Sequence, residues 1–378
     1  MPFTGKATYT AGATLPEVAE DVSDLIAINS PHDTPLLDAL GDPPRSARST
    51  VHEWLEDSLL PNTDTIVSVA SSTIVVENAS RFRVGDQLAV QDFDEIMLVS
   101  AVDEGTGALT VIRAYGNTPS SPISAGQTIR ILGNAALEGD DASAARFSSR
   151  QRVANYTQIF SATVEVSGSE LAVRQIGLRD ELDYQKNQRA RELLRDLENS
   201  LINGVAPAAS PQGSSTIRRT MRGLLSFIST NRFVPGQNLP TGTSLTEQML
   251  NLALRSIWSG SAGQVDLIVV GGPEKRAINN FVASNRRFTA DGESYKSLVN
   301  VYESDFGVCR VVLSRYVPAG TVLLLDSSRI DVLPLAGRSF HYKPLATTGD
   351  REAGLVIGEY TLELRNENAH GVISGFTA

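Results

Sequence analysis

The chain has 378 residues and a formal net charge of −10, so as a whole it has no electrostatic reason to coat nucleic acid. Its length and its hydrophobic content of 41% are typical of a globular protein with two or three domains and a substantial core. With no run of about 20 apolar residues, no secretory signal after Met1 and a single cysteine, Cys309, we expect neither a membrane span nor a disulfide framework.

Residues 1–46 have the composition of an arm rather than of a domain. Short helices are expected at 22–27 and 36–40, the second ended by the Gly and Pro residues that follow Leu40. Two interpretations remain open: a disordered tail, or an arm that orders only along a neighbouring subunit. In the second interpretation the acidic residues of the arm would meet basic groups across the contact; they are Glu17, Glu20, Asp21 and Asp24.

Residues 51–59 alternate as a strand, and their natural partner is the segment 152–166, almost a hundred residues later. A two-stranded ribbon is marginally stable in water, so this one needs another element to lie on. Trp54, Tyr156 and Phe160 are large aromatic residues on a ribbon without a core of its own. We therefore expect them to be buried against another element and take them as candidates for a subunit interface, with an internal core as the alternative.

Between the two ribbon strands, residues 62–135 predict a separate all-β module. Short segments rich in Val, Ile and Leu, separated by Gly turns, predict six strands at 65–69, 73–77, 87–91, 95–102, 108–113 and 127–132. Six such strands are typical of a small barrel or sandwich. The module either stiffens the loop that carries it or binds a host glycan or a decoration protein; the lack of an aromatic cluster argues against a glycan. We expect it to face outward and to be replaceable by a short linker.

Two arginine-rich segments each allow two interpretations. The acidic run 138–141 is followed by Arg146, Arg150 and Arg152, either as a solvated loop or as one half of intersubunit ion pairs. After the Pro/Ala/Ser/Gly loop 205–215 comes the densest basic cluster of the chain. This cluster either contacts phosphates of DNA or pairs with acidic groups of a neighbour; its members are Arg218, Arg219 and Arg222.

A long helix is predicted from residue 178 to residue 202, and we call it the spine helix. One face is apolar, through Leu178, Leu182, Ala190, Leu193, Leu197 and Leu201. Its middle, 185–189, is polar nearly all round, which is typical of a helix that lies across a surface. Arg195 is three residues from both Glu192 and Glu198, which places all three on the exposed side. Asn203-Gly204 predicts a left-handed stop.

Residues 226–340 predict a mixed α/β region. Ser244-Leu245-Thr246-Glu247 is a capping box for a helix with Leu245, Met249, Leu252, Ala253 and Ile257 inward. A buried strand at 265–270 leads through Gly271-Gly272-Pro273 into a second helix, and strands at 299–303, 308–314, 321–325 and 329–333 complete a sheet. A final strand at 354–365 should lie with one face on the spine helix.

Catalytic and cofactor motifs are missing from the sequence. The four histidines are scattered and form no H-E-x-x-H pair, and there is no G-x-S-x-G elbow. The strand–Gly-Gly–helix junction lacks the G-x-G-x-x-G pattern, and the Walker pattern does not occur. We therefore expect no cofactor, no metal and no enzymatic activity, although a hydrolase with an α/β core stays a third class of function.

Several separated motifs occur in an order that resembles the major capsid (major head) proteins of tailed phages. They are Asn155–Phe160, Ser167-Gly168, Gly177 with Glu181–Gln185, Glu192–Glu198 and, upstream, 24–37 and His52–Leu59. The resemblance covers most of 15–60 and 138–230 and the general layout beyond. Residues 62–135 depart from the family pattern and have the character of an insertion.

The resemblance implies the Hong-Kong-ninety-seven-type (Johnson) capsid fold, an α+β architecture. Its expected parts are an N-terminal arm (1–46), an extended loop (47–165) carrying the inserted β domain (62–135), a peripheral domain with the spine helix (166–225 and 340–378) and an axial domain (226–339).

The resemblance also implies a function: self-assembly as hexamers and pentamers into the icosahedral shell that encloses the genome, within the virion and after assembly in the host bacterial cytoplasm. Expected partners are further copies of the chain, a portal, a decoration protein and, because there is no long N-terminal coiled coil, a separate scaffolding protein. Contact with packaged DNA should be weak and non-specific. The alternative is a tail or baseplate structural protein.

The shell should be held without covalent bonds. Some shells of this fold are sealed by an isopeptide bond from a loop lysine. Here the lysines are only Lys6, Lys186, Lys275, Lys296 and Lys343, and none lies between 47 and 165. Arginines, 28 of the 33 basic residues, should instead form bidentate pairs with carboxylates.

Overall fold

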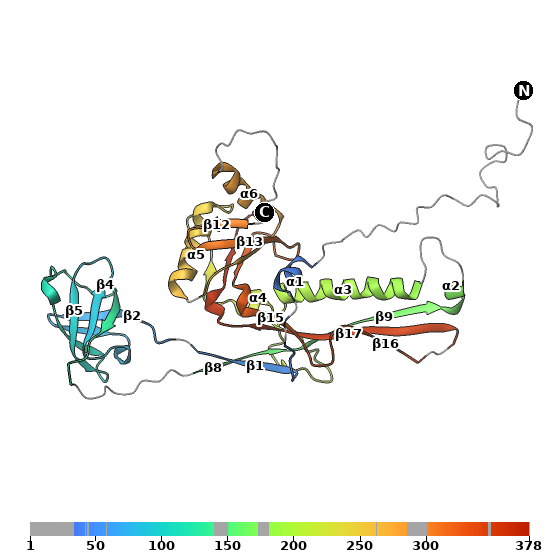
Figure 1. Cartoon of the computed structure of the whole chain (residues 1–378), viewed down its shortest axis with the longest axis horizontal. Coiled ribbons are helices and arrows are strands. Elements are labelled where there is room, and N and C mark those ends of the chain that lie inside the picture. Colours follow the sequence, from blue (N-terminus) through green and yellow to red (C-terminus); the bar gives the residue numbers. More distant parts are fainter. Residues whose placement is uncertain are drawn as a thin grey trace, which may run out of the picture. The chain divides into compact units, whose positions relative to one another are not determined.

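The computed structural model describes residues 34–41, 43, 45–57, 59–139, 150–172, 181–261, 263–285, 301–346 and 349–377 (Figure 1). The chain divides into two compact units. Residues 55–151 form the barrel unit, and residues 1–54 with 152–378 form the main unit.

The barrel unit is a closed six-stranded barrel with the neighbour order β2-β3-β6-β5-β4-β7. Its strands are β2 (Thr63–Ala70), β3 (Thr73–Val76), β4 (Asp86–Val90), β5 (Ile96–Asp103), β6 (Ala108–Ile112) and β7 (Thr128–Asn134). Alternate side chains such as Ile74, Leu88, Met97 and Leu109 fill its interior without exposed surface. The six predicted strands are therefore confirmed, and the barrel has a core of its own.

In the main unit, the predicted α/β region forms a six-stranded sheet in the order β10-β18-β14-β11-β13-β12. The strands are β10 (Arg232–Phe233), β11 (Leu267–Val270), β12 (Val301–Ser304), β13 (Gly307–Leu313), β14 (Thr321–Leu325) and β18 (Gly371–Ser374). Every residue of β11 and β14 is buried, because apolar layers cover both faces of the sheet. β18 comes from the segment 340–378, so the expected axial domain takes a strand from the expected peripheral one.

Helices α5 (Glu247–Gly260) and α6 (Gly272–Asn285) follow the predicted order. The capping box is wrong by two residues: Thr246 is the N-cap, and its side chain accepts the Met249 N–H at 3.3 Å. Met249, Ala253 and Ile257 point inward as predicted, whereas Leu252 is exposed. With the helix starting at Glu247, the buried stripe passes through Leu250 and Leu254 instead.

A second sheet lies beside the spine helix α3 (Glu181–Asn203) and has the order β15-β17-β16, with β9 on the other edge of β17. Its strands are β9 (Gln158–Ser167), β15 (Ile330–Pro334), β16 (His341–Pro344) and β17 (Arg351–Leu364). Two predictions are wrong here. β9 pairs with β17 rather than with the first ribbon strand, and β15 belongs to this sheet rather than to the six-stranded one. The spine helix packs against β9 and β17, as predicted for the final strand (Figure 1).

The spine helix is buried unevenly along its length. From Asp183 to Glu192 no side chain is fully buried, which confirms the predicted polar middle, whereas Leu193, Leu197 and Leu201 are buried. The helix ends at Asn203, but Gly204 does not have a positive φ, so the predicted left-handed stop is wrong. Glycine is needed there for space, because a Cβ would come within 2.3 Å of the Ser200 carbonyl oxygen.

The remaining elements of the main unit are short. They are α1 (Pro35–Leu40), β1 (Val51–Glu56), β8 (Gln151–Tyr156), α2 (Gly168–Ala172) and α4 (Leu224–Phe227). The helix predicted at 36–40 is therefore confirmed, and the one predicted at 22–27 lies outside the described residues.

Candidate functional site

The ribbon predicted from the sequence exists as a two-stranded sheet of β1 and β8. Ion pairs lie along it: Arg152 is 3.4 Å from Glu53, and Arg150 is 3.8 Å from Asp57. All four side chains are substantially exposed, so each pair contributes little to stability. Arg150 and Arg152 thus have acidic partners in their own chain. The charges at these two positions can be accounted for without contact with a second subunit.

The aromatic residues of the ribbon have partners inside the main unit. Trp54 is 8% exposed, with its ring 6.0 Å from that of Phe227, and Phe160 is 5% exposed, with its ring 6.3 Å from that of Phe340. The premise that these two side chains lack a core of their own is wrong, because both belong to the apolar cluster of the main unit, Phe160 from β9 and Trp54 from β1. Their assignment to a subunit interface loses its support. Tyr156 is only half-buried.

The basic cluster after the spine helix is mostly committed within the chain. Arg219 forms a 2.6 Å ion pair with the buried Glu359, and its Nε donates to the Thr157 carbonyl at 2.6 Å. Arg222 lies over the Phe227 ring at 4.1 Å, and burial lowers its pKa. Only Arg218 of the three is exposed. Of the three arginines, Arg218 is therefore the one left exposed for either interpretation, contact with DNA phosphates or pairing with acidic groups of a neighbour.

Four of the predicted interface residues lie outside the described part of the chain: Glu17, Glu20, Asp24 and Arg146. Asp21 lies there as well.

Charged side chains tie the end of the arm and the start of the ribbon to strand β17. Arg45 forms ion pairs with Asp331 and, at 3.2 Å, with Glu363. His52 Nε2 lies 2.6 Å from the same Glu363, and Arg365 is 3.2 Å from Asp331. Burial acts to raise the pKa of Glu363, but the hydrogen bond with His52 and the charge of Arg45 lower it overall. These contacts hold residues 45–52, at the start of the ribbon, against strands β15 and β17.

Glu198 of the spine helix is fully buried, contrary to the expectation that it lies on the exposed side with Arg195. Its Oε2 accepts the backbone N–H groups of Leu36 (3.1 Å) and Leu37 (3.3 Å), and its Oε1 is 2.9 Å from the Ser314 hydroxyl. Burial raises its pKa to about 7. The sequence carried a signal for this. Glu198 lies one helical turn before the apolar Ile202, so the two side chains share a face of the helix, and Ile202 is buried.

The barrel unit also contains a buried glutamate, Glu95, which the sequence analysis did not single out. Arg113 holds it with two hydrogen bonds of 2.6 Å, and the N–H groups of Ala114 (3.0 Å) and Ser121 (2.7 Å) donate to it as well. The hydrogen bond from Arg113 is the main reason that its pKa is lowered to about 2. This group joins the residue before β5 to the end of β6 and to the loop that follows β6.

Chemical groups suited to catalysis are not gathered in the described residues. Among them, no set of three or more His, Cys, Asp and Glu side chains is placed to hold a metal ion. His370 is buried, its Nδ1 accepts the Asp326 N–H at 3.1 Å, and burial lowers its pKa to about 4. Within the same residues no helix is long and apolar enough to cross a membrane.

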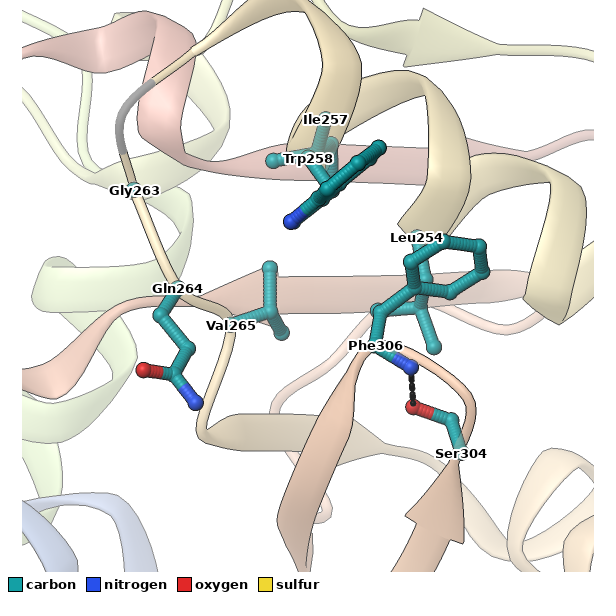
Figure 2. A pocket seen from close by; sticks show the side chains of 8 residues that line it. All are labelled: Leu254, Ile257, Trp258, Gly263, Gln264, Val265, Ser304 and Phe306. Atoms are coloured by element: carbon teal, nitrogen blue, oxygen red, sulfur yellow. Dashed lines mark hydrogen bonds between the residues drawn. The ribbon is translucent and has the colours of Figure 1, made fainter.

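A pocket between α5 and the β12–β13 turn has about 10 Å³ of space, enough for about one water molecule (Figure 2). Its rim includes Trp258, which is 61% exposed and has its ring 5.7 Å from that of Phe306. Figure 2 shows Gln264 and Ser304 as the polar side chains beside them. The space is too small for an organic substrate.

The family model of the SU10 major capsid protein matches residues 3–377. The chain belongs to this family. Major capsid proteins form the head shell, so copies of this chain build the icosahedral capsid of a tailed phage, and its place is the virion. This decides against the tail or baseplate alternative. None of the curated proteins matches the sequence.

Solved capsid structures resemble this major capsid protein over nearly its whole length. The capsid of a native GTA particle has a TM-score of 0.58 at 9% identity and covers 100% of both chains. Microbacterium phage Oxtober96 has a TM-score of 0.52 at 14% identity over 94% of this chain and 95% of that one. The capsid of Myoviridae phage XM1 has a TM-score of 0.52 at 11% identity over 97% and 100%. At these identities the likeness shows the fold, which is of the Hong-Kong-ninety-seven type.

Proposed function

We propose that this major capsid protein assembles as hexamers and pentamers through non-covalent contacts, and that the outer end of the ribbon is one of the contacting surfaces. The observation that carries the proposal is the ribbon itself. Within the described chain, β1 and β8 pair only with each other, and although Trp54 of β1 packs into the main unit, the next residue, Leu55, is exposed. Leu55 (62%) near the end of β1 and Leu59 (94%), three residues beyond that strand, are strongly exposed, as is Leu137 (79%) after β7. A neighbouring copy would bury these side chains.

The non-covalent nature of the shell is argued from the missing reactive groups. No lysine lies between 47 and 165, so the extended loop has no amine for an isopeptide bond. Cys309 is 1% exposed, hydrogen-bonds to the Val265 carbonyl, and has its pKa raised to about 11 by burial. A buried neutral thiol is a poor partner for an intersubunit disulfide.

The remaining partners follow from the same role. We propose a separate scaffolding protein, a portal and assembly in the host bacterial cytoplasm, with the barrel facing outward as the binding place of a decoration protein. The protein acts as a structural component rather than as an enzyme.

Expression of the chain, alone or with its scaffolding protein, should give closed shells or capsomers without DNA under the electron microscope. A non-reducing denaturing gel of the particles should show single chains. Tubes, a stable monomer at all concentrations, or ladders of covalent multimers would each contradict the proposal.

The ribbon surface is tested separately by Leu59→Ser, which should lower shell yield while the unassembled protein keeps its melting temperature. Val67→Ser, at an exposed apolar position on the barrel wall, is the matched control and should assemble normally. Equal yields from both variants would remove the ribbon end from the interface.

A further inference from the structure

The first turn of α1 is capped by a side chain from a different helix. The Leu36 and Leu37 N–H groups at this helix start both donate to Oε2 of Glu198, about 160 residues later in the chain. Thr34, the N-cap residue by position, makes no side-chain capping bond. The spine helix therefore supplies the capping oxygen that α1 lacks locally.

The position of Glu198 is costly, which indicates that it serves a purpose. The side chain has no exposed surface, its hydrogen bonds come from two amides and one hydroxyl, and the nearby carboxylate of Asp38 opposes its charge. Burial of a carboxylate without a cation is unfavourable, and a leucine would suit an apolar helix face better. Its raised pKa reflects the same cost.

The three partners of Glu198 come from separate elements. The two amides belong to α1, and Ser314 directly follows β13, where its hydroxyl also accepts the Tyr316 N–H at 3.4 Å. Leu36 is fully buried in the same apolar cluster as Leu197 and Leu201. The carboxyl group thus joins the arm end, the spine helix and the six-stranded sheet at one point.

The chain is tied down a second time shortly after α1. The Ala47 N–H donates to the Pro334 carbonyl at 2.8 Å, and the Ala336 N–H donates back to the Ala47 carbonyl at 2.8 Å. Arg45 adds its ion pairs to Asp331 and Glu363. Residues 45–47 are therefore held by the second sheet whatever happens at α1, and Glu198 acts on the segment where residues 1–33 join the main unit.

We propose that Glu198 is a positioning residue for shell assembly: it clasps the first turn of α1 and so sets the point and direction in which the N-terminal arm leaves the spine helix. A second copy of the chain receives the arm in a defined place only when this exit is defined. The assembly part of this inference rests on the proposed contact between arm and neighbour, whereas the clasp itself is measured on the unassembled protein, so the two can fail separately.

The test compares two changes at the same position. Glu198→Gln keeps an oxygen for the two amides and an NH₂ group for Ser314, so the amides of Leu36 and Leu37 should exchange with deuterium within about twofold of the wild-type rate. Glu198→Asp keeps the charge but is one methylene too short, so their exchange should rise by about tenfold or more. The closed-shell fraction should fall for Glu198→Asp and stay normal for Glu198→Gln.

Glu192→Gln is the matched control, because Glu192 lies on the same helix but on its surface, 2.6 Å from Arg189. It should change neither exchange nor assembly. Unchanged exchange in Glu198→Asp, or an equal rise in Glu198→Gln, would overturn the clasp. Raised exchange with normal shells would overturn its positioning role. Should Glu198→Asp fail to fold, Ser314→Ala replaces it. The exchange rate of the same two amides should then rise by a smaller factor. An unchanged rate would count against the clasp.

Discussion

The barrel unit and the main unit each contain a buried glutamate, Glu95 and Glu198, whose pKa values shift in opposite directions. Glu95 in the barrel is 1% exposed and Glu198 in the spine helix is 0% exposed. Arg113 holds Glu95 as a carboxylate with a pKa lowered to about 2. Glu198 has only neutral donors, and burial raises its pKa to about 7. Two glutamates with almost no exposed surface thus have opposite shifts, because the hydrogen bond from Arg113 is the largest cause for Glu95 and desolvation is the largest cause for Glu198.

The difference has a consequence for how each unit is stabilised. In the barrel a bidentate arginine–carboxylate pair holds the loop after β6, so this contact depends on both partners being charged. The clasp on the spine helix works with a neutral carboxyl, because Oε1–H can donate to Ser314 Oγ while Oε2 still accepts two amides. Acid should therefore weaken the barrel, and neutral to basic pH should weaken the clasp.

The largest effect is expected from Arg113→Ala, which leaves Glu95 buried without its cation. The barrel should lose about 3–5 kcal/mol, the usual result of breaking one side of a buried ion pair. Both tryptophans, Trp54 and Trp258, lie in the main unit, so their fluorescence reports that unit alone, whereas calorimetry reports both. The calorimetric barrel transition should move while the tryptophan transition stays in place.

Arg130→Ala removes an exposed arginine from strand β7 of the same barrel and is the control for Arg113→Ala. It should change barrel stability by less than about 0.5 kcal/mol. Equal losses in the two variants would show that the Glu95 pair contributes no more than a surface charge.

A smaller change in the free energy of unfolding is expected when the pH is varied. A glutamate in the unfolded chain releases its proton near 4.5, whereas folded Glu198 keeps it to about 7, so the main unit should lose roughly 3 kcal/mol of stability between these values as pH rises. Glu198→Gln should flatten the tryptophan-detected stability over this range. For Glu95 the sign is reversed: its contribution is present above 4.5 and is lost as pH falls toward 2. The same slope in wild type and Glu198→Gln would contradict the assignment.

The smallest effect is expected when residues 62–135 are replaced by a short Gly/Ser linker. The barrel has its own apolar cluster, and the sheets of the main unit take no strand from it. Tryptophan-detected unfolding of the main unit should therefore change by no more than about 0.5 kcal/mol. Circular dichroism should show the loss of β signal only. An insoluble or unfolded product would mean that the main unit needs the barrel.

Local patterns in the sequence were sufficient for elements whose stability is decided by nearby residues. The barrel strands alternate apolar and polar side chains between glycine turns, so all six were predicted close to their positions. The spine helix and its polar middle followed from the 3.6-residue period, and α1 followed from the Gly and Pro residues after it. The order of the motifs along the chain was also enough to indicate the capsid family.

Only the tertiary structure decided which distant segments meet. β9 alternates equally well whether it pairs with β1 or with β17, and β15 fits either sheet, because strand pairing depends on partners far along the chain. Trp54 and Phe160 are buried within the main unit for the same reason. Glu198 lies three residues from Arg195, which favoured a surface pair, but the arrival of α1 and Ser314 on that face of the helix buried it. Charge and period are properties of the sequence, whereas burial is a property of what packs against it.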